Sequence, residues 1–375
     1  MASVLVAHPS PDVYGSDLQL IESVTAMTAD GMRVSVSLPA HGPLEALLTQ
    51  VGASVSVLRV PVLRRAVLRP AGLLALALAA PLALVQMIRA IRRSGADVVY
   101  VNTVTIPLWL LAARLAGRRA LCHVHEAEEA ESRLVRVGLN SPILLATTVV
   151  TNSKASARAL WSALPRLRGR TVVLANGVPE SAPSGLQPEP GRIALVARLS
   201  PRKGIDVALD AVGLLRRQGR EVHLQVCGTA FEGYEWFEQQ LRERAARDDL
   251  AGTVTFSGYV NPTRPVLDAA NIVLVPSRVE PFGNTAVEAM LAGRPLIASD
   301  VQGLAEIVDD GRTGLLVQPG DPSALASAIA LLLDDPEMAA QLAQAAQLAA
   351  REHFGVERYR REISAIVTQL ARPAA

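Results

Sequence analysis

Two glutamates, Glu280 and Glu288, stand eight residues apart in the stretch EPFGNTAVEAMLAGRPLIASD. Paired carboxylates can act as general acid and base on a glycosidic bond, with about 5–9.5 Å between the two carboxyl groups on opposite sides of that bond. Neighbours in one turn and one helix are poorly placed for such an arrangement. The alternative chemistry is binding, in which both carboxylates accept hydrogen bonds from the hydroxyls of a ligand.

The turn around Glu280 follows a predicted strand, NIVLVPS, and should lie at the carboxyl edge of a parallel sheet, where open α/β sheets bind ligands. Asn284 or Thr285 can cap the helix that follows. A carboxylate in the first helical turn favours the helix dipole, which explains Glu288 without a ligand. Glu280 has no such explanation and is well placed to accept from ligand hydroxyls. The backbone amides expected along the same wall are those of Phe282, Gly283 and Asn284.

A second candidate site lies in RIALVARLSPRKGIDVALDAV, which predicts a strand, a tight loop and a helix. Arg198 ends the strand, and Lys203 and Gly204 stand where the helix begins. Cations beside a helix N-terminus oppose the macrodipole unless an anion is bound there, and a phosphate satisfies both. Of the 37 basic residues only Lys154 and Lys203 are lysine, so Lys203 suggests a compact point charge. A solvated loop is the alternative.

The first half of the chain carries two further candidates. HPSPDVYGSDLQLIESV leads from a strand into a helix, and Gly15 in its loop could approach a phosphate closely. The loop lacks the GxGxxG fingerprint, which argues against a nicotinamide enzyme. In HVHEAEEAE, His123 and His125 alternate onto one face, but without a further His or Cys cluster a metal site is not expected. His8 follows the first predicted strand.

The elements that position these residues are short apolar strands alternating with helices, which indicates parallel sheets covered on both faces. A Pro/Gly/Ser-rich run over 177–191 separates two series of strands and predicts a linker. We therefore expect two α/β domains, over about 1–180 and 181–355, with a last helix near 356–371 that returns to the first domain.

The composition excludes several protein classes. Half of the residues are hydrophobic, 3% are aromatic and the net charge is +2, which is typical of a globular enzyme and not of a disordered or nucleic-acid-coating protein. The two cysteines, Cys122 and Cys227, fall in predicted strands as small buried residues. No cationic leader precedes an apolar stretch at Met1, so we expect a cytoplasmic protein.

Together these motifs resemble the retaining GT-B glycosyltransferases of family 4. The resemblance rests on the paired glutamates and on five stretches in order along the chain: ANGV at Ala175, VARLSPRKGID, CGTA at Cys227, FSGYV at Phe256 and GLAEIVDDGRTGLLV. It implies two facing Rossmann-like domains with a cleft between them, a nucleotide-sugar donor bound mainly by the second domain, and a glycan or lipid-linked, cell-envelope acceptor. No cofactor and no obligatory metal are implied.

The resemblance also implies roles for single residues. Arg198 and Lys203 would hold the donor diphosphate, Glu288 the ribose and Glu280 the donor sugar, while His125 would lie in the cleft. The other residues implied at the donor are Gly15, Phe282, Gly283, Asn284 and Thr285, and those implied at the nucleotide pocket are Gly228, Thr229, Tyr259 and Val260. The leaving phosphate would help to deprotonate the acceptor. A silent partner subunit of the same fold, a nucleotide-sugar 2-epimerase and, third, a nicotinamide oxidoreductase are the alternatives.

Residues 59–93 contain seven arginines and no acid around the apolar run AGLLALALAAPLALVQMI. Eighteen nearly uncharged residues approach the length of a transmembrane helix, but Pro81 and Gln86 interrupt them. A helix pair partly buried in the first domain is a second interpretation. The third is a basic amphipathic surface that docks on anionic lipid at the cytoplasmic membrane face.

Overall fold

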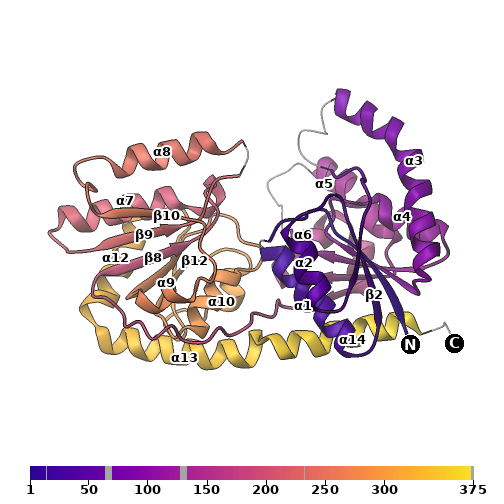
Figure 1. The fold of residues 1–375 in the computed structure, drawn as a ribbon. Helices are drawn as coiled ribbons and strands as arrows, with labels where there is room; N and C mark the ends of the chain where they lie inside the picture. The colour runs from indigo at the N-terminus through magenta and orange to yellow at the C-terminus, as the bar shows by residue number, and fades with distance from the viewer. Residues whose placement is uncertain (14, 64–69, 127–132, 232, 373–375) are drawn as a thin grey trace. The chain divides into compact units, whose positions relative to one another are not determined.

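The computed structural model describes residues 1–13, 15–63, 70–126, 133–231 and 233–372. The chain divides into two compact units, unit 1 over Met1–Gly177 with Val356–Ala375, and unit 2 over Val178–Gly355. Each unit holds one parallel sheet that is covered by helices on both faces (Figure 1). This is the predicted α/β architecture.

Unit 1 has a sheet of order β3-β2-β1-β4-β5-β6-β7. Its strands are β1 (Ser3–Ala7), β2 (Arg33–Leu38), β3 (Ser54–Val57), β4 (Val98–Asn102), β5 (Arg119–Val124), β6 (Thr148–Thr151) and β7 (Thr171–Val173). Its helices are α1 (Gly15–Ala29), α2 (Pro43–Gln50), α3 (Pro70–Ser94), α4 (Leu108–Leu115), α5 (Arg133–Asn140), η2 (Ser141–Leu145), α6 (Lys154–Ala163), η3 (Pro165–Arg170) and α14 (Val356–Ala371).

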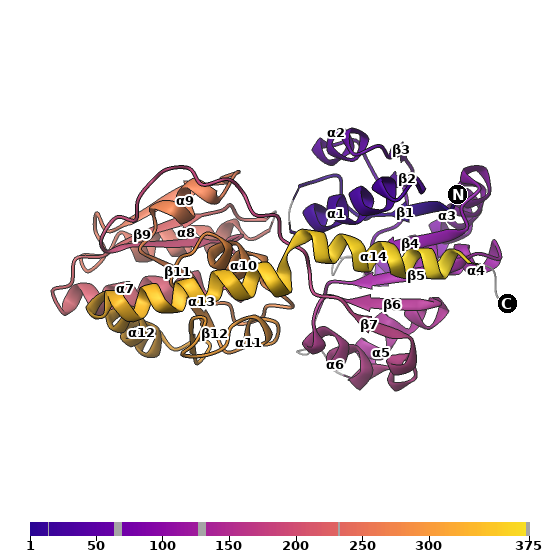
Figure 2. The same ribbon diagram turned by 90° about the horizontal axis from the view of Figure 1, so that it is seen from below.

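Alternation along the central strand of unit 1 divides its core between two faces. Val4 and Val6 of β1 belong to one apolar cluster, whereas Leu5 and Ala7 belong to the other. Successive side chains of a strand point to opposite faces, so a fully apolar strand requires cover on both. The face of Val4 and Val6 is closed in part by α14, which lies beside α1 (Figure 2) and buries Tyr359.

Unit 2 repeats the architecture with the order β10-β9-β8-β11-β12-β13. Its strands are β8 (Arg192–Val196), β9 (His223–Cys227), β10 (Val254–Gly258), β11 (Ile272–Val275), β12 (Leu296–Ser299) and β13 (Leu315–Val317). Its helices are η4 (Pro201–Lys203), α7 (Ile205–Arg217), α8 (Glu235–Ala245), α9 (Arg264–Ala269), α10 (Asn284–Leu291), α11 (Leu304–Ile307), α12 (Pro322–Asp334) and α13 (Pro336–Phe354). In both units the strand order reverses once, between β1 and β4 and between β8 and β11.

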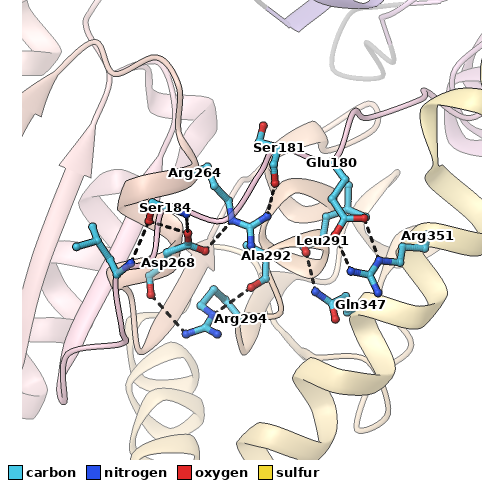
Figure 3. A network of polar contacts seen from close by, with 11 residues as sticks. Glu180, Ser181, Ser184, Arg264, Asp268, Leu291, Ala292, Arg294, Gln347 and Arg351 are labelled. Carbon is cyan, nitrogen blue, oxygen red and sulfur yellow. Dashed lines mark hydrogen bonds and ion pairs between the residues drawn. The ribbon is translucent and has the colours of Figure 1, made fainter.

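The Pro/Gly/Ser-rich run that composition predicts as a linker belongs to unit 2 from Val178 onward, and hydrogen bonds hold it on that unit. Arg264 donates to the carbonyl of Ser181 (2.7 Å) and to Asp268 (2.6 Å), and Asp268 accepts from the amide and hydroxyl of Ser184 at 2.7 and 2.8 Å (Figure 3). Those hydrogen bonds outweigh the burial that raises the pKa of Asp268, and the net result is a lowered pKa. The run is therefore an ordered part of the unit 2 surface.

In the described part of the basic segment 59–93 the structure has one helix, α3, and not a pair, and this helix continues through Pro81. Its inner face buries Ala83, Met87 and Ile91, spaced by four residues. Within the described ranges no helix has the length and apolar character needed to cross a bilayer. Residues 64–69 of this segment lie outside the described residues.

Candidate functional site

The candidate site of unit 2 lies where the sheet order reverses. Because β8 and β11 are parallel neighbours, the loops that leave their carboxyl ends meet at one edge. The loop after β8 carries Arg198 and Lys203, and the loop after β11 carries Glu280. The sheet therefore brings together residues that are about 80 positions apart in the chain.

Lys203 and Glu280 form an ion pair, with 2.5 Å between Lys203 Nζ and Glu280 Oε2. Ser277 Oγ donates to the same carboxylate oxygen at 3.1 Å, and the Glu280 amide donates to Gln302 Oε1 at 3.0 Å. Glu280 is buried and its charge is balanced where it lies, as a buried carboxylate requires. Ser277 and Gln302 were not singled out from the sequence, since nothing in their own stretches marks them as partners of Glu280.

A backbone contact at Gly204 holds the two loops together. Gly204 has a left-handed φ of 66° and forms the N-cap of α7. A Cβ atom at this position would lie 1.9 Å from the carbonyl oxygen of Pro276 in the loop after β11. Only glycine permits this approach, so the start of α7 and the ion pair keep a fixed separation.

A second contact joins the loop after β11 to the first turn of α7, where Arg278 pairs with Asp206. Two parallel hydrogen bonds join them, Nη1 to Oδ1 at 2.8 Å and Nη2 to Oδ2 at 2.7 Å, and Nη1 also donates to the carbonyl of Pro201 at 2.8 Å. Planar arginine–carboxylate pairs of this kind fix orientation as well as distance. Sequence analysis missed this ion pair because Arg278 lies in the loop after β11 and Asp206 in the first turn of α7, about 70 positions apart in the chain.

Arg198 contacts a third loop, the one that follows β9 and carries Phe231. Its guanidinium carbon stands 3.7 Å from the centre of the Phe231 ring, a cation–π contact. Two backbone bonds join the loops, from Ala197 N to the carbonyl of Cys227 (2.9 Å) and from Leu199 N to the carbonyl of Thr229 (3.0 Å). Arg198 is thus positioned at the same edge of the sheet as Lys203.

The residues predicted for a nucleotide pocket follow β9, which lies next to β8, and β10, the edge strand beyond β9. The Gly228 amide donates to the carbonyl of Gly258 at 2.7 Å, which joins the two loops. Thr229 is exposed, Val260 is partly buried and Tyr259 is 53% exposed. Gly228 and Thr229 therefore contact the loop of Arg198, Tyr259 and Val260 follow β10 in the adjoining loop, and 53% of Tyr259 is exposed.

The cap predicted for α10 is wrong. Gly283, with a φ of 121°, occupies the N-cap, and neither Asn284 nor Thr285 caps the helix. Leu304 Cδ2 stands 2.6 Å from where a Cβ of residue 283 would lie, so a capping side chain has no room there. Thr285 Oγ1 donates instead to the carbonyl of Val196 at the end of β8 (3.3 Å).

Glu288 lies one turn further into α10 than predicted, so the helix dipole does not explain it. Thr263 Oγ1 donates to Glu288 Oε2 at 3.0 Å. Burial raises the pKa of Glu288, and the hydrogen bond from Thr263 only partly opposes that effect. Phe282, by contrast, turns its ring inward onto Phe354, with 5.8 Å between ring centres, so only its backbone amide is available to a ligand.

Unit 1 has its own polar cluster where its sheet order reverses, at the ends of β1, β4 and β5. His125 Nε2 lies 2.8 Å from Asn102 Oδ1, Asn102 Nδ2 lies 3.0 Å from His8 Nδ1, and His8 Nε2 lies 2.8 Å from Asp17 Oδ1. Burial lowers the pKa of His125 to about 4, with a further contribution from His8. Gly15 is the first residue of α1, which also carries Asp17, and Tyr14 before it lies outside the described residues.

No metal cluster is found in the part of the chain that the structure describes, where no three His, Cys, Asp or Glu side chains come together. His123 and His125 do lie close, with 4.1 Å between ring centres. His123 is engaged elsewhere, since its Nδ1 lies 2.6 Å from the hydroxyl of Tyr100.

Both halves of the chain match models of known protein families. Residues 179–349 match the family model of glycosyl transferases group 1, and residues 15–182 match that of glycosyltransferase family 4. HepE of Anabaena, crystallised with UDP and glucose, has a TM-score of 0.83 at 26% identity, with 97% of this chain and 99% of that chain covered. The chain has the GT-B glycosyltransferase fold. The GT-B neighbour HepE was also solved with UDP-glucose, at a TM-score of 0.84.

Curated relatives of this GT-B chain match over shorter regions. D-inositol 3-phosphate glycosyltransferase of Nocardia farcinica is 34% identical over 246 residues, which is 61% of this chain and 54% of that protein. The lipopolysaccharide core biosynthesis mannosyltransferase LpsB of Rhizobium meliloti is 31% identical over 191 residues, 50% of this chain and 54% of that protein. Glycogen synthase of Mycobacterium tuberculosis is 34% identical over 160 residues. The chain thus spans between 37% and 54% of the lengths of these relatives.

Proposed function

We propose that the protein is a retaining glycosyltransferase that moves a sugar from a nucleoside diphosphate donor, UDP-sugar by preference, to a glycan or lipid-linked acceptor of the cell envelope. The observation that carries the proposal is the Lys203–Glu280 pair at the start of α7, beside Arg198. Two cations at a helix N-terminus suit a diphosphate, and the adjacent carboxylate suits sugar hydroxyls. The GT-B neighbour HepE, solved with UDP-glucose, supports the choice of donor.

In this proposal each residue of the unit 2 site has one task. Arg198, Lys203 and the amides at the start of α7 stabilise the negative charge that develops on the leaving diphosphate. Glu280 Oε2 is taken by Lys203 and Ser277, and Oε1 accepts from hydroxyls of the donor sugar. Glu288 accepts from the ribose. The backbone amides of residues 282–284 and Thr285 line the sugar, and residues 228–229 and 259–260 line the base.

Retention is proposed because the carboxylate nearest the donor is not free to attack. The ion pair with Lys203 and the hydrogen bond from Ser277 hold the negative charge of Glu280 Oε2, which lowers its nucleophilicity. The acceptor hydroxyl then attacks from the face that the diphosphate leaves, and a diphosphate oxygen takes its proton. The anomeric signal of the product tests this step: α-linked product from UDP-glucose supports it, and β-linked product rules it out.

We place the acceptor at unit 1 and the enzyme in the cytoplasm, at the inner membrane face. The relationship to LpsB, a lipopolysaccharide core mannosyltransferase, supports an envelope acceptor. The outer face of α3 supports a membrane contact: Leu78 and Leu82 are 73% and 64% exposed and lie one turn apart, followed on the exposed side by Arg89, Arg92 and Arg93. Apolar side chains followed by cations suit an anionic lipid surface, at about 1 kcal/mol per arginine.

Flotation with liposomes tests the membrane contact. Vesicles of phosphatidylglycerol should carry the protein upward, whereas vesicles of phosphatidylcholine should not. Replacing both Leu78 and Leu82 by serine should abolish flotation, while Leu348→Ser on the exposed side of α13 should leave it intact. Equal flotation of the two variants would show that α3 does not make the membrane contact.

The two alternative functions, a silent partner subunit and a nucleotide-sugar 2-epimerase, differ from glycosyl transfer in what an assay would detect. A silent partner subunit would bind nucleotide weakly or not at all, and a 2-epimerase would exchange a sugar proton with solvent. Both interpretations are disfavoured by the intact ion pair of Lys203 and Glu280, which serves donor binding and offers no free base for proton abstraction.

The experiment that tests the function combines binding and turnover. Thermal-shift measurements with UDP, GDP, dTDP and ADP should raise the midpoint for one nucleotide, because ligand at 100 times Kd adds about 2.7 kcal/mol to the stability of the native state. The matching nucleotide sugar, incubated with the protein and a lipid extract, should then release its nucleoside diphosphate. No shift with any of the four nucleotides would favour the silent subunit.

A further inference from the structure

Four polar side chains of unit 1 form a continuous hydrogen-bonded row at the carboxyl edge of its sheet. Asp17 comes from α1, His8 follows β1, Asn102 ends β4 and His125 follows β5. The three links are 2.8, 3.0 and 2.8 Å long, in that order. Each link joins two different elements, so the row is a property of the fold and not of one loop.

The proton positions along this row follow from its first member. A carboxylate only accepts, so the proton between Asp17 and His8 is on His8 Nε2. The lone pair of His8 Nδ1 then accepts from Asn102 Nδ2, which turns the amide oxygen of Asn102 toward His125. That oxygen can only accept, so His125 carries its proton on Nε2 and keeps Nδ1 bare.

Because the row is buried, water does not compete for its hydrogen bonds, and the donor and acceptor roles stay as described. His8, Asp17 and Asn102 are each at most 3% exposed. His125 Nδ1, by contrast, makes no hydrogen bond to any residue that the structure describes. The row therefore presents one imidazole nitrogen with a defined role, that of a hydrogen-bond acceptor.

We propose that Asn102 is a positioning residue that, oriented by His8 and Asp17, fixes His125 as an acceptor for a hydroxyl of a substrate bound at this edge of the unit 1 sheet. This inference rests on the proposed glycosyl transfer for its purpose, but the proton arrangement itself does not. If His125 carried its proton on Nδ1, this nitrogen would be a donor. The substrate hydroxyl could then no longer donate to it and would have to rotate to accept. Asn102 does not touch the substrate in this scheme and acts only through His125.

Nitrogen NMR tests the proton arrangement without any substrate. In the full chain labelled with ¹⁵N-histidine, His125 should show a neutral ring that carries its proton on Nε2, with Nδ1 unprotonated, between pH 6 and pH 8. His125→Gln identifies its signals by their loss. A proton on His125 Nδ1, or a His125 imidazolium at pH 7, would overturn the proposal whether or not the protein transfers sugar.

Turnover of Asn102→Asp tests the consequence. A carboxylate against His125 Nε2 stabilises the imidazolium, and a neighbouring opposite charge moves a pKa by roughly 1–3 units. Two other groups that act on His125 keep their contacts: His123, with its ring 4.1 Å away, and Glu126, which accepts from the His125 amide. His8, held in turn by Asp17, loses the amide donor to its Nδ1 and faces a carboxylate oxygen instead, which adds to the change that the variant makes.

The expected result is a new acid limb in the pH profile of kcat/KM. Asn102→Asp should lose activity between pH 8 and pH 6, by up to about tenfold for the largest of these shifts, because a charged His125 no longer accepts, while the wild type stays nearly flat. Asn152→Asp is the matched control, since Asn152 is also buried in unit 1 and accepts from Ser156 Oγ at 2.9 Å. A profile of Asn102→Asp that matches this control would refute the positioning role.

Discussion

The contact at Gly204 makes a quantitative prediction for the loop that carries Lys203. Replacing Gly204 by alanine places a methyl group 1.9 Å from the carbonyl oxygen of Pro276 and 2.9 Å from its carbon. The left-handed conformation costs an alanine about 1–2 kcal/mol. Forcing the loop after β11 aside adds about 1–3 kcal/mol, the usual cost of overpacking.

Gly219 separates these two contributions. It has a φ of 79°, close to the 66° of Gly204, but a Cβ there would meet no atom within 4 Å. Gly219→Ala should therefore lower the free energy of unfolding only by the cost of the left-handed conformation, about 1–2 kcal/mol. Gly204→Ala should lose about 1–3 kcal/mol more.

Urea unfolding followed by circular dichroism measures the two free energies, and calorimetric titration measures UDP binding. Gly204→Ala should also bind UDP more weakly, because the displaced loop moves Lys203 away from Glu280, while Gly219→Ala should bind UDP as the wild type does. Equal destabilisation of the two variants would show that the loops are not in contact at Gly204, and the description of the site would fail.

Three further outcomes follow from buried groups. Tyr359→Phe removes a hydroxyl 2.6 Å from Ser23 Oγ and should lower the free energy of unfolding by about 1 kcal/mol in urea titrations. Hydrogen bonds hold the pKa of Asp268 below its usual range despite burial, so its contribution to stability is present above about pH 3.9 and is lost as the pH falls through the folded pKa. The stability difference between wild type and Asp268→Asn should accordingly shrink in acid. Burial raises the thiol pKa of both Cys122 and Cys227, so a thiol reagent at pH 8 should modify neither until the protein unfolds.

Strand patterns and loop composition were sufficient to predict the two parallel sheets. In SVLVA and RIALV every residue after the first is apolar, which indicates strands covered on both faces, and both are inner strands of their sheets in the structure. The position of Lys203 and Gly204 at a helix start was also predicted correctly, because a strand, a short loop and a helical pattern follow one another there.

Contacts between loops could not be predicted in the same way. Lys203 and Glu280 were expected to bind different parts of a ligand, yet they pair directly with each other. That pairing depends on β8 and β11 being neighbours, which is set by the strand order and not by any local pattern. The row from Asp17 to His125 escaped notice for the same reason.

Local conformation explains the remaining errors. Asn284 and Thr285 have the side chains of good caps, but the crowding by Leu304 leaves space only for Gly283 at the N-cap. The Pro/Gly/Ser-rich run was predicted as a linker from composition alone. Composition carries no information about Arg264 and Asp268, which bind its backbone to unit 2.

The central claim is that Lys203 binds the diphosphate of a nucleotide donor, and calorimetric titration of UDP and of uridine tests it most directly. Lys203→Met should weaken UDP binding by about 10- to 150-fold, the equivalent of one charged hydrogen bond of about 1.5–3 kcal/mol. Binding of uridine, which has no phosphate, should not change. Lys154→Met, which removes the chain's other lysine from the start of α6, should leave both affinities unchanged. Unaltered UDP binding by Lys203→Met, or an equal loss for UDP and uridine, would contradict the assignment of the diphosphate site.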